Sequence, residues 1–538
     1  MDAVAPAPVT QSPQRGFFRR WRVPMIAVGI PLALFAFLFA TQSLEVLPEA
    51  MFPVMMAFQV TFLVGLLTLL IWFPFFSPLR PRTRIAVILV LALGLGAWIS
   101  QIKRVEFYGT MGMRIYYRGQ TDPREAAEQY LASAKPTEEK LSAGDVVVTP
   151  TDFARYRGEK GDGSIAYISL DAWKDKGFKL VKQQPIGGGY AGFVVFGKVM
   201  VTLEQRGKDE AVVCYDRDSA KEVWVHRYQA FFEQSEPMGG SGSRATPAVQ
   251  DGLIYSVGAV GDLVCLDATD GSLKWKRNIL TDNGAANIQW GVTASPLIVG
   301  DKVIVQAGID PKNNVGKAVA AYDRRNGNPL WATGTHPAGY ASPSLATFDG
   351  MPQVVIFDGE GLAGLDPADG NELWRYPWKT QFDMNNIQPL YFPGDRVFIS
   401  SEQANGCAML KVAKAEGAWK VESVWKNRSM AARFANPVSR GELIFGISNN
   451  RLTCVDAKNG KRLWKDGDFG SGQLLAAGDT LLVQGETGDI AAVAAEPTGY
   501  RELARLHVFD GKVWNTPAFS RGRLYLRTHE QMAIIETP

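Results

Sequence analysis

A pattern of Asp, Gly and Trp recurs along the chain and constrains its fold more than any other feature. It occurs in CLDATDGSLKW (265–275), AYDRRNGNPLW (321–331), GLDPADGNELW (364–374) and CVDAKNGKRLW (454–464), with Asp eight residues before Trp. CYDRDSAKEVW (214–224) keeps this spacing with Ala220 in the glycine position, and a degenerate copy ends at Trp425. Successive Trp residues of the series are 39 to 56 residues apart, which is typical of the four-stranded blades of a β-propeller.

A second signal counts the blades independently. Eight tight turns are each followed by a short alternating strand, and they lie at Gly197, Asp251, Gly300, Gly350, Gly394, Gly441, Gly478 and Gly522. Each is typical of a hairpin within one sheet. The eighth turn lies too near the C-terminus for a whole blade, so we expect Phe178–Gln184 to supply the missing outer strand. The sequence predicts an all-β, eight-bladed propeller of four-stranded antiparallel blades over residues 151–538.

The repeated residues have structural roles in this interpretation. We expect the aspartates to accept hydrogen bonds from amides of their own turn, the glycines to adopt positive φ, and the tryptophans to wedge between blades. The aspartates and glycines concerned are Asp216, Asp267, Asp323, Asp366, Asp456, Gly271, Gly327, Gly370 and Gly460.

This pattern resembles the bacterial pyrroloquinoline-quinone-binding-like β-propeller repeat family over about residues 152–538. FARYRGEKGDG (153–163) is similar to a segment that precedes the propeller in membrane-associated members of that group. The resemblance implies the fold more strongly than an activity. The family includes quinoprotein alcohol and sugar dehydrogenases, and it also includes propellers that bind no quinone, such as an outer-membrane assembly scaffold lipoprotein.

Three uncharged apolar runs precede the propeller, at Val23–Ala40, Met51–Phe76 and Ile85–Ile102. Each is long enough to cross or nearly cross a bilayer core of about 30 Å, which predicts three transmembrane helices within residues 23–102. A cleaved signal peptide is the alternative for the first run, although two further spans follow it. We expect residues 1–22 to form a cytoplasmic tail and residues 103–150 to form a linker with a short helix at 121–134.

The arginines around these runs predict the orientation. Arg15, Arg19, Arg20 and Arg22 precede the first run, Arg80, Arg82 and Arg84 separate the second from the third, and Glu45 and Glu49 lie between the first two. By the positive-inside rule, the N-terminus is cytoplasmic and the propeller lies on the other side of the inner membrane, in the periplasm.

Composition and cysteine usage exclude other classes. The chain has 57 Lys and Arg against 54 Asp and Glu, and this balance gives no reason to expect a nucleic-acid partner. Cys214, Cys265 and Cys454 occupy equivalent places in different blades, so we expect these cysteines and Cys407 to be small core residues without disulfides.

The candidate site lies at one mouth of the central channel. Inner-strand starts and long connections, notably 225–244 and 276–294, share this face, and long loops on a rigid scaffold are where binding concentrates. The candidate residues are Tyr190, Arg244, Thr246, Trp290, Ser295, Tyr340, Asn386, Gln388, Arg433, Asn436, Gln473, Trp514 and Asn515. Aromatic planes and guanidinium groups together suit a small planar anionic ligand. Alternatively, the polar residues only secure the strand starts, and Trp290 and Trp514 plug the channel.

The sequence commits to no cofactor. A pyrroloquinoline quinone with calcium remains an option, for which Glu204, Glu402 and Asn436 are conceivable calcium ligands, but no compact acidic motif nominates them. The adjacent cysteines usual in alcohol-oxidising members of the family are absent from the sequence. We find no catalytic motif, and the scattered histidines His226, His336, His507 and His529 form no metal signature.

The leading functional hypothesis is a membrane-tethered, extracytoplasmic propeller that binds a ligand or an envelope protein. The alternative is a quinone-dependent sugar or alcohol dehydrogenase that feeds electrons to the membrane quinone pool. A sensor or assembly scaffold is a third class, which the sequence does not separate from the first.

Overall fold

The computed structural model describes residues 13–43, 51–109, 112–134, 137, 140–174, 176–233, 239–402 and 405–538. Glu45 and Glu49, which entered the orientation argument, lie outside these residues. The chain divides into two compact units, Met1–Lys103 and Arg104–Pro538.

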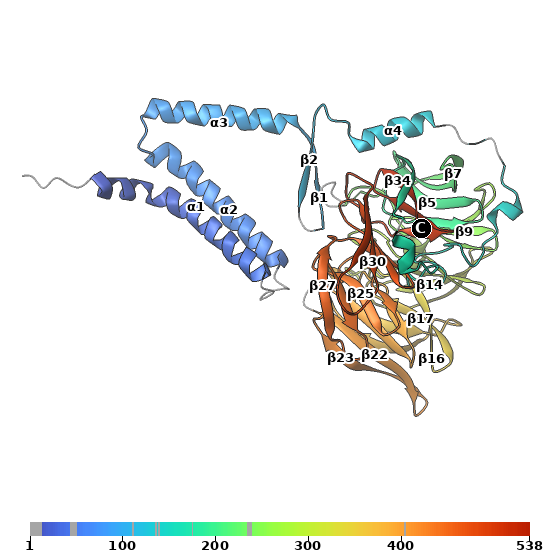
Figure 1. The fold of residues 1–538 in the computed structure, drawn as a ribbon. Coiled ribbons are helices and arrows are strands. Elements are labelled where there is room, and N and C mark those ends of the chain that lie inside the picture. The colour runs from blue at the N-terminus through green and yellow to red at the C-terminus, as the bar shows by residue number, and fades with distance from the viewer. Residues whose placement is uncertain are drawn as a thin grey trace, which may run out of the picture. The chain divides into compact units, whose positions relative to one another are not determined.

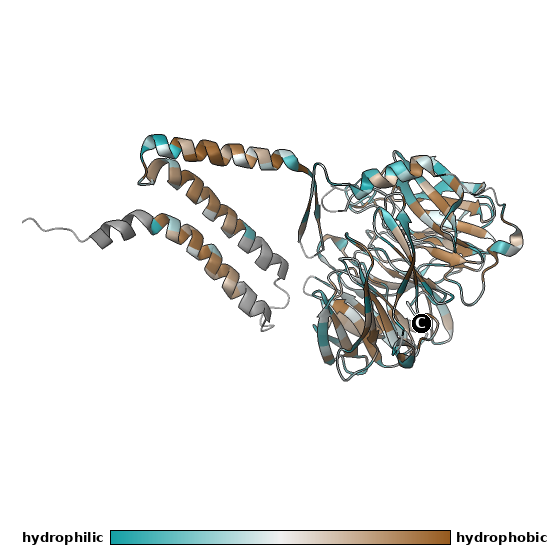
Figure 2. Ribbon diagram, turned by 45° about the horizontal axis from the view of Figure 1, so that its top comes forward, coloured by the Kyte–Doolittle hydropathy of each residue, from teal (hydrophilic) through white to brown (hydrophobic). Residues whose placement is uncertain are grey.

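The first unit contains three helices: α1 (Pro13–Ser43), α2 (Met51–Phe76) and α3 (Pro81–Gln101). Apolar residues dominate α2 and α3, as the brown ribbon in Figure 2 shows. Among the described residues, Gln59–Phe76 and Pro81–Gln101 are long and apolar enough to cross a membrane, whereas the apolar stretch Arg22–Phe37 of α1 is shorter. Of the three expected spans, two are therefore supported by length and composition.

The turn between α2 and α3 is fixed by an arginine. Arg84 donates from Nε to the carbonyl of Leu79 at 2.8 Å and from Nη1 to the carbonyl of Pro74 at 3.0 Å. The bond to Pro74 satisfies a carbonyl in the last turn of α2, and the bond to Leu79 holds the turn that follows. Pro81 then begins α3, where the missing amide of proline costs nothing.

The second unit contains eight four-stranded antiparallel sheets, which are the blades of a propeller (Figure 1). Blade 1 is formed by β4 (Val194–Phe196), β5 (Val199–Arg206), β6 (Asp209–Asp216) and β7 (Glu222–Gln229), and blade 2 by β8 (Ala248–Gln250), β9 (Leu253–Val257), β10 (Asp262–Asp267) and β11 (Leu273–Asn278). Blade 3 is formed by β12 (Leu297–Val299), β13 (Lys302–Gln306), β14 (Val319–Asp323) and β15 (Pro329–Thr333). Blade 4 is formed by β16 (Ser344–Phe348), β17 (Met351–Phe357), β18 (Gly361–Leu365) and β19 (Glu372–Pro377).

Blades 5 to 7 follow the same order from the channel outward. Blade 5 is formed by β20 (Leu390–Phe392), β21 (Arg396–Ser401), β22 (Gly406–Ala415) and β23 (Ala418–Asn427). Blade 6 is formed by β24 (Val438–Arg440), β25 (Leu443–Ser448), β26 (Arg451–Asp456) and β27 (Arg462–Asp468). Blade 7 is formed by β28 (Gln473–Ala477), β29 (Thr480–Gln484), β30 (Asp489–Ala494) and β31 (Glu502–His507). Short helical segments lie between strands, namely α5 (Ile279–Asn283) and the 3-10 turns η2 (Leu170–Trp173) and η3 (Gln381–Asp383).

Blade 8 joins the two ends of the propeller. It consists of β32 (Ala518–Ser520), β33 (Arg523–Arg527), β34 (Gln531–Glu536) and, as its outer strand, β3 (Lys179–Pro185) from before the first blade. The register runs from Lys179 opposite Glu536 to Pro185 opposite Gln531. The expected closing strand is therefore confirmed, and so is the eight-bladed fold.

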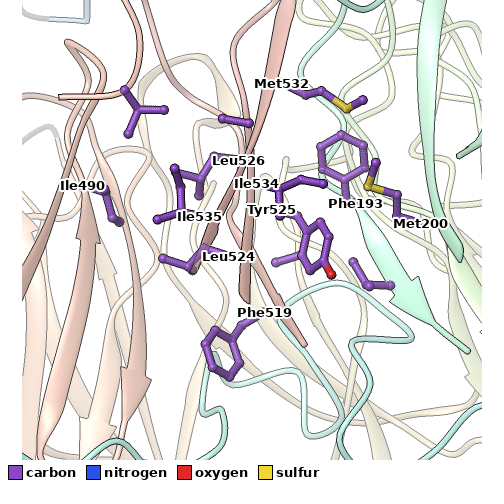
Figure 3. Close-up of a cluster of buried hydrophobic side chains, with 14 of the residues drawn as sticks. Phe193, Met200, Ile490, Phe519, Leu524, Tyr525, Leu526, Met532, Ile534 and Ile535 are labelled. Carbon is purple, nitrogen blue, oxygen red and sulfur yellow. The ribbon is translucent and has the colours of Figure 1, made fainter. Parts of the chain in front are cut away.

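An apolar core fills the seam around blade 8 (Figure 3). Side chains of β33 and β34, such as Leu526 and Ile534, lie between Phe193 and Met200 of blade 1 and Ile490 of blade 7. All of these side chains are at most 1% exposed. Burial of this size stabilises the seam by about 1.5–3 kcal/mol for each large side chain.

The repeated tryptophans connect each blade to the next. Five indole Nε1 groups donate at 2.8–3.2 Å to a carbonyl in the turn between the third and fourth strands of the following blade. The donors are Trp224, Trp275, Trp331, Trp425 and Trp464. Trp374 is the exception, because it donates to Gln353 of its own blade at 2.6 Å. The expected packing of tryptophan between blades is thus a contact of one indole ring with one turn of the next blade, and we call this contact the clip.

The recurrence of Gly at this turn position of the repeat follows from the clip. Gly271 has φ +69°, and a Cβ there would lie 2.5 Å from Cε3 of Trp224. Ala220 holds the same turn position in blade 1, with φ +58°. The strand that faces it, β3, has no tryptophan, and Gln184 donates to the Ala220 carbonyl at 2.7 Å. Alanine is tolerated there because no indole ring covers the turn.

The predicted turn chemistry and cysteine roles are confirmed. Gly271, Gly327, Gly370 and Gly460 all have positive φ, and each repeat aspartate accepts from amides two or three residues ahead. The four cysteines are buried and unpaired.

The described residues of 104–150 belong to the same compact unit as the propeller, where a linker was expected. The elements here are a hairpin of β1 (Ile102–Phe107) and β2 (Met113–Tyr117), the helix α4 (Pro123–Ser133) and the 3-10 turn η1 (Ala143–Val146). The short helix is present, and Asp122 caps it by accepting from the Arg124 amide at 3.0 Å. Buried charged residues on β1, described below, make this segment part of the propeller unit.

Gly271→Ala should lower the free energy of unfolding by about 2–4 kcal/mol, because the new methyl meets Trp224 and a non-glycine residue is strained at this φ. The matched substitution Ala220→Gly, at the turn that no indole covers, should change it by less than about 1 kcal/mol. Denaturant unfolding of the full chain in detergent, followed by circular dichroism, measures both. Equal effects of the two substitutions would contradict the clip.

Candidate functional site

A ring of hydrogen bonds joins the inner-strand starts at the channel mouth. The Thr246 amide donates to Ser295 Oγ at 2.9 Å, and the Ser295 amide donates to Ser342 Oγ at 2.9 Å. The ring continues from Ser342 to Gln388 Oε1 (3.2 Å), from Gln388 to Asn436 Oδ1 (2.6 Å), and from Asn436 to Gln473 Oε1 (3.5 Å). Each bond runs from one blade to the next. We call this set the girdle.

The girdle continues across the closing seam. Gln473 Nε2 lies 3.5 Å from the Trp514 carbonyl, Asn515 donates to the Ala191 carbonyl at 3.2 Å, and the Gly192 amide donates to Thr246 Oγ1 at 3.0 Å. Six candidate residues therefore use side-chain polar atoms to hold the blades together, namely Thr246, Ser295, Gln388, Asn436, Gln473 and Asn515. For these residues the structure favours the alternative role foreseen from sequence, which is to secure the strand starts.

Three other candidates gather on one side of the mouth. The Tyr190 ring centroid lies 5.6 Å from that of Trp514 and 5.3 Å from that of His529. The Arg244 guanidinium lies 5.7 Å from the Tyr190 ring and 4.8 Å from the Phe232 ring. Arg244 donates to the carbonyls of Gly240 and Gly242, and burial lowers its pKa to about 10.

The remaining candidates lie further round the ring. Arg433 pairs with Glu402 at 2.9 Å, and its carbonyl accepts from Asn386 Nδ2 at 3.0 Å. Trp290 and Tyr340 are both half-buried, on the connections that enter blades 3 and 4. The structure thus divides the expected set into the girdle, an aromatic group at blades 8 and 1, and separate residues at blades 3 to 6.

The β1–β2 hairpin covers the sector of the mouth at blades 6 to 8. Lys512 Nζ donates to the Phe107 carbonyl at 3.2 Å and lies 3.7 Å from the Glu106 carboxylate. Arg433 Nη1 donates to the Gly109 carbonyl at 2.6 Å, and the Gly109 amide donates to Glu486. Glu486 also accepts from Trp514 Nε1 at 2.7 Å and from the Ser471 amide at 3.0 Å.

A second group of charges fixes the base of the hairpin. Arg104 pairs with Asp122 at 3.2 Å and with Glu530 at 3.5 Å, and Glu530 also contacts Arg124 at 3.5 Å and His529 at 3.2 Å. Burial alone would raise the pKa of Glu530, but His529 and the two guanidinium groups outweigh it and lower the pKa to about 2.

Sequence reasoning missed this part of the mouth. Arg104, Glu106 and Lys512 are at most 7% exposed, although such residues are rarely buried without a partner. One signal was present, because the hairpin strand alternates Arg104 and Glu106 on one face with apolar residues on the other. A strand pattern of this kind is unexpected in a flexible linker.

The channel below the girdle contains the chain segment 153–164. Phe153 pairs with Val195 of blade 1, the Ala154 carbonyl accepts from Val249 of blade 2, and Ser164 pairs with Ala476 of blade 7. From this segment, Tyr156 OH accepts from Asn436 Nδ2 at 2.8 Å, and the fully buried Arg157 donates to the Pro437 carbonyl at 2.6 Å. The segment whose sequence resembles other membrane-associated propellers therefore plugs the channel from within.

The conceivable calcium ligands do not form a metal site. Glu204 is fully buried and accepts from Tyr215 OH, from Arg206 at 2.9 Å and from the Gly187 amide at 2.8 Å. Glu402 is paired with Arg433, and Asn436 belongs to the girdle. In the part of the chain that the structure describes, no three His, Cys, Asp or Glu side chains are grouped to hold a metal ion. Glu204, Glu402 and Asn436 are therefore each engaged elsewhere and are not grouped as a calcium site.

Fold and mouth define the protein as an eight-bladed propeller with a channel plugged from inside and a mouth partly covered by its own hairpin. Residues 208–466 match the pyrroloquinoline-quinone repeat family model described as Outer membrane protein assembly factor BamB. The resemblance to the pyrroloquinoline-quinone-like repeat family is thereby confirmed for the propeller. The comparison with curated proteins gave no match.

Several solved structures are similar to this chain at low identity. BamB from Moraxella catarrhalis is 13% identical, with 67% of this chain and 97% of that chain covered and a TM-score of 0.46. Quinohemoprotein alcohol dehydrogenase ADHIIG from Pseudomonas putida HK5 is 12% identical, with 75% and 82% covered and a TM-score of 0.49. A europium-containing methanol dehydrogenase is 13% identical, with 72% and 98% covered and a TM-score of 0.44.

Docking of the hairpin should depend on pH through Glu530. Folding lowers the pKa of this carboxyl from about 4.5 to about 2, so its contribution is complete above pH 4.5 and is lost as pH falls toward 2. We expect the Arg104–Phe107 amides to lose hydrogen-exchange protection across this window, relative to a free peptide at each pH. Glu530→Gln should be poorly protected throughout. Equal relative protection of the unmodified protein at pH 3 and pH 6 would contradict this assignment.

Proposed function

We propose that this protein is a membrane-tethered propeller of the bacterial envelope that binds another protein through the loops of its channel mouth. The helices α2 and α3 provide the anchor. The propeller lies in the periplasm, because the arginines between α2 and α3 favour a cytoplasmic location for that turn, from which α3 crosses to the other side.

The observation that carries this proposal is that the polar and aromatic groups of the mouth already contact other parts of the same chain. Six polar candidates belong to the girdle, and Arg433, Lys512 and Trp514 contact the hairpin or the glutamate that holds it. A small planar ligand needs such groups to be free and convergent. A protein partner needs only an accessible rim with a few large anchors.

The uncovered rim offers such anchors. Phe231 is 50% exposed on the connection from blade 1 to blade 2, and Phe382 is 63% exposed on the connection from blade 4 to blade 5. Phe382 also has φ +60°, a strained conformation for a bulky residue. Strained residues that present a side chain to solvent are concentrated at binding sites. Exposed aromatic side chains on a rigid scaffold favour protein recognition.

The family match supports the class of partner. The matched family model is described as an outer membrane protein assembly factor, which makes an assembly or scaffold role in the envelope our preferred form of the proposal. Glu402, a conceivable calcium ligand at the mouth, is instead paired with Arg433 at 2.9 Å, which favours this form over a dehydrogenase.

The purified full chain should not take up pyrroloquinoline quinone in the presence of Ca²⁺. We expect no shift of the cofactor's absorbance on mixing and no dye reduction with sugars or alcohols, since the girdle and the hairpin occupy the groups that would hold it. A quinone dehydrogenase treated in parallel serves as the positive control. Uptake with turnover would replace our proposal by the dehydrogenase alternative.

Photo-crosslinking residues placed at Phe382 and Trp290 should capture the same envelope protein in living cells. The control is Val424, which is 51% exposed on the outer strand of blade 5 and away from the mouth. It should capture little of that protein. Equal capture at all three positions, or at none, would contradict a binding rim at the mouth.

A further inference from the structure

The way the mouth holds its own hairpin reveals a recognition site for polypeptide. We define the cradle as Arg433, Ser471, Glu486, Lys512 and Trp514. Arg433 and Lys512 donate to main-chain carbonyls of Gly109 and Phe107, and Glu486 accepts from the Gly109 amide. Contacts of this kind read the path of a backbone and require no particular side chain there.

Position 109 does impose one requirement, which is the absence of a side chain. A Cβ on Gly109 would lie 2.2 Å from Ser471 Oγ and 2.9 Å from Glu486 Oε1. The cradle therefore fits a glycine closely.

Two further positions add charge to this pattern. Glu106 lies 3.7 Å from Lys512, and it also accepts from Tyr116 OH at 3.1 Å. Arg104 pairs with Glu530, 3.5 Å away. The bound strand thus reads Arg-x-Glu-x-x-Gly, with a cation, an anion and a glycine each met by a fitting group on the propeller.

The hairpin is held by polar contacts and not by the core. Among the described residues, the seven apolar clusters of the protein contain no member of the hairpin. Buried ion pairs recover little more than the cost of their own desolvation, so they set register more than they add stability. A segment with few buried apolar contacts opens at a lower free energy than the whole fold. The occupant of the cradle is therefore exchangeable.

From these contacts we infer that the cradle is a peptide-binding site which the β1–β2 hairpin fills in cis, and that it accepts an extended Arg-x-Glu-x-x-Gly segment of a partner protein when the hairpin leaves. The inference rests on the proposed protein-binding function and names the chemistry of the bound segment. Because the hairpin is tethered, it acts as a competitor of high effective concentration that keeps the site closed until a partner segment of higher affinity displaces it.

An engineered disulfide tests the exchange. Cβ atoms at positions 109 and 471 would be 2.9 Å apart, which small adjustments bring into the range of about 3.5–4.5 Å that disulfides require. In the full-length double variant Gly109→Cys, Ser471→Cys, the disulfide replaces the Ser471 hydroxyl that a side chain at position 109 would otherwise meet, so oxidation should lock the hairpin in the cradle. A fluorescent peptide of residues 102–117 should then fail to bind, and reduction of the same sample should restore its binding.

Release of the hairpin should have the opposite effect. In Arg104→Ala, Glu106→Ala, we expect peptide affinity to rise about tenfold or more over the unmodified chain, since the competing segment is weakened. Addition of Arg433→Gln should reverse the gain. A peptide with valine in place of Gly109 is the matched control and should not bind.

Two outcomes would overturn the inference. One is peptide binding that is the same in the oxidised and reduced samples, and the other is no binding by the released variant. Neither depends on Phe382 or Trp290, so these results are separate from the crosslinking at the uncovered rim. Crosslinking without peptide binding would leave the proposed function standing and remove the cradle, and the reverse result would remove the rim.

Discussion

The clip that joins five of the repeat tryptophans to the next blade's turn is the contact on which the architecture depends. It combines an indole hydrogen bond with a flat packing surface that only a glycine, free of Cβ and at positive φ, provides. Where the ring lacks such a tryptophan, at β3, the partner turn carries Ala220 and a glutamine takes over the hydrogen bond. The Ala220 turn therefore follows the same rule as the repeats, in which glycine is required only where an indole ring packs on the turn.

The girdle performs a related task on the channel side. Because each amide donates to a side chain of the next blade, polar residues that resemble a ligand site by composition serve to align strand starts. In the function that we propose, recognition falls to groups outside this ring. The charges on the rim meet the hairpin, and the aromatic side chains of the long connections meet solvent. Scaffold and proposed binding surface are therefore built from adjacent residues.

Periodicity predicted the propeller, its blade number and its closing strand, because these follow from local patterns such as the spacing of Asp267 and Trp275. The site was harder to predict. Sequence placed Tyr190, Arg244 and Trp514 on one face, and they do lie together. It did not show that Arg104 and Lys512 reach the same mouth, because their partners are about 400 residues away in sequence. Contacts of that range leave no local pattern, so a buried hairpin was expected to be a linker.

The closing strand also governs the order in which the chain is able to fold. Blades 2 to 7 each join a neighbour that precedes them in sequence, so they can be added to blade 1 one after another as the polypeptide emerges. Lys179 and Glu536 pair across 357 residues, and this step has to wait for the last strand to be synthesised. Until then β3 keeps an unpaired edge and blade 7 lacks the blade that packs against it, and such exposed surfaces are the usual starting points for misassembly. The chain is thus most prone to misassembly in the interval before β3 pairs with β34.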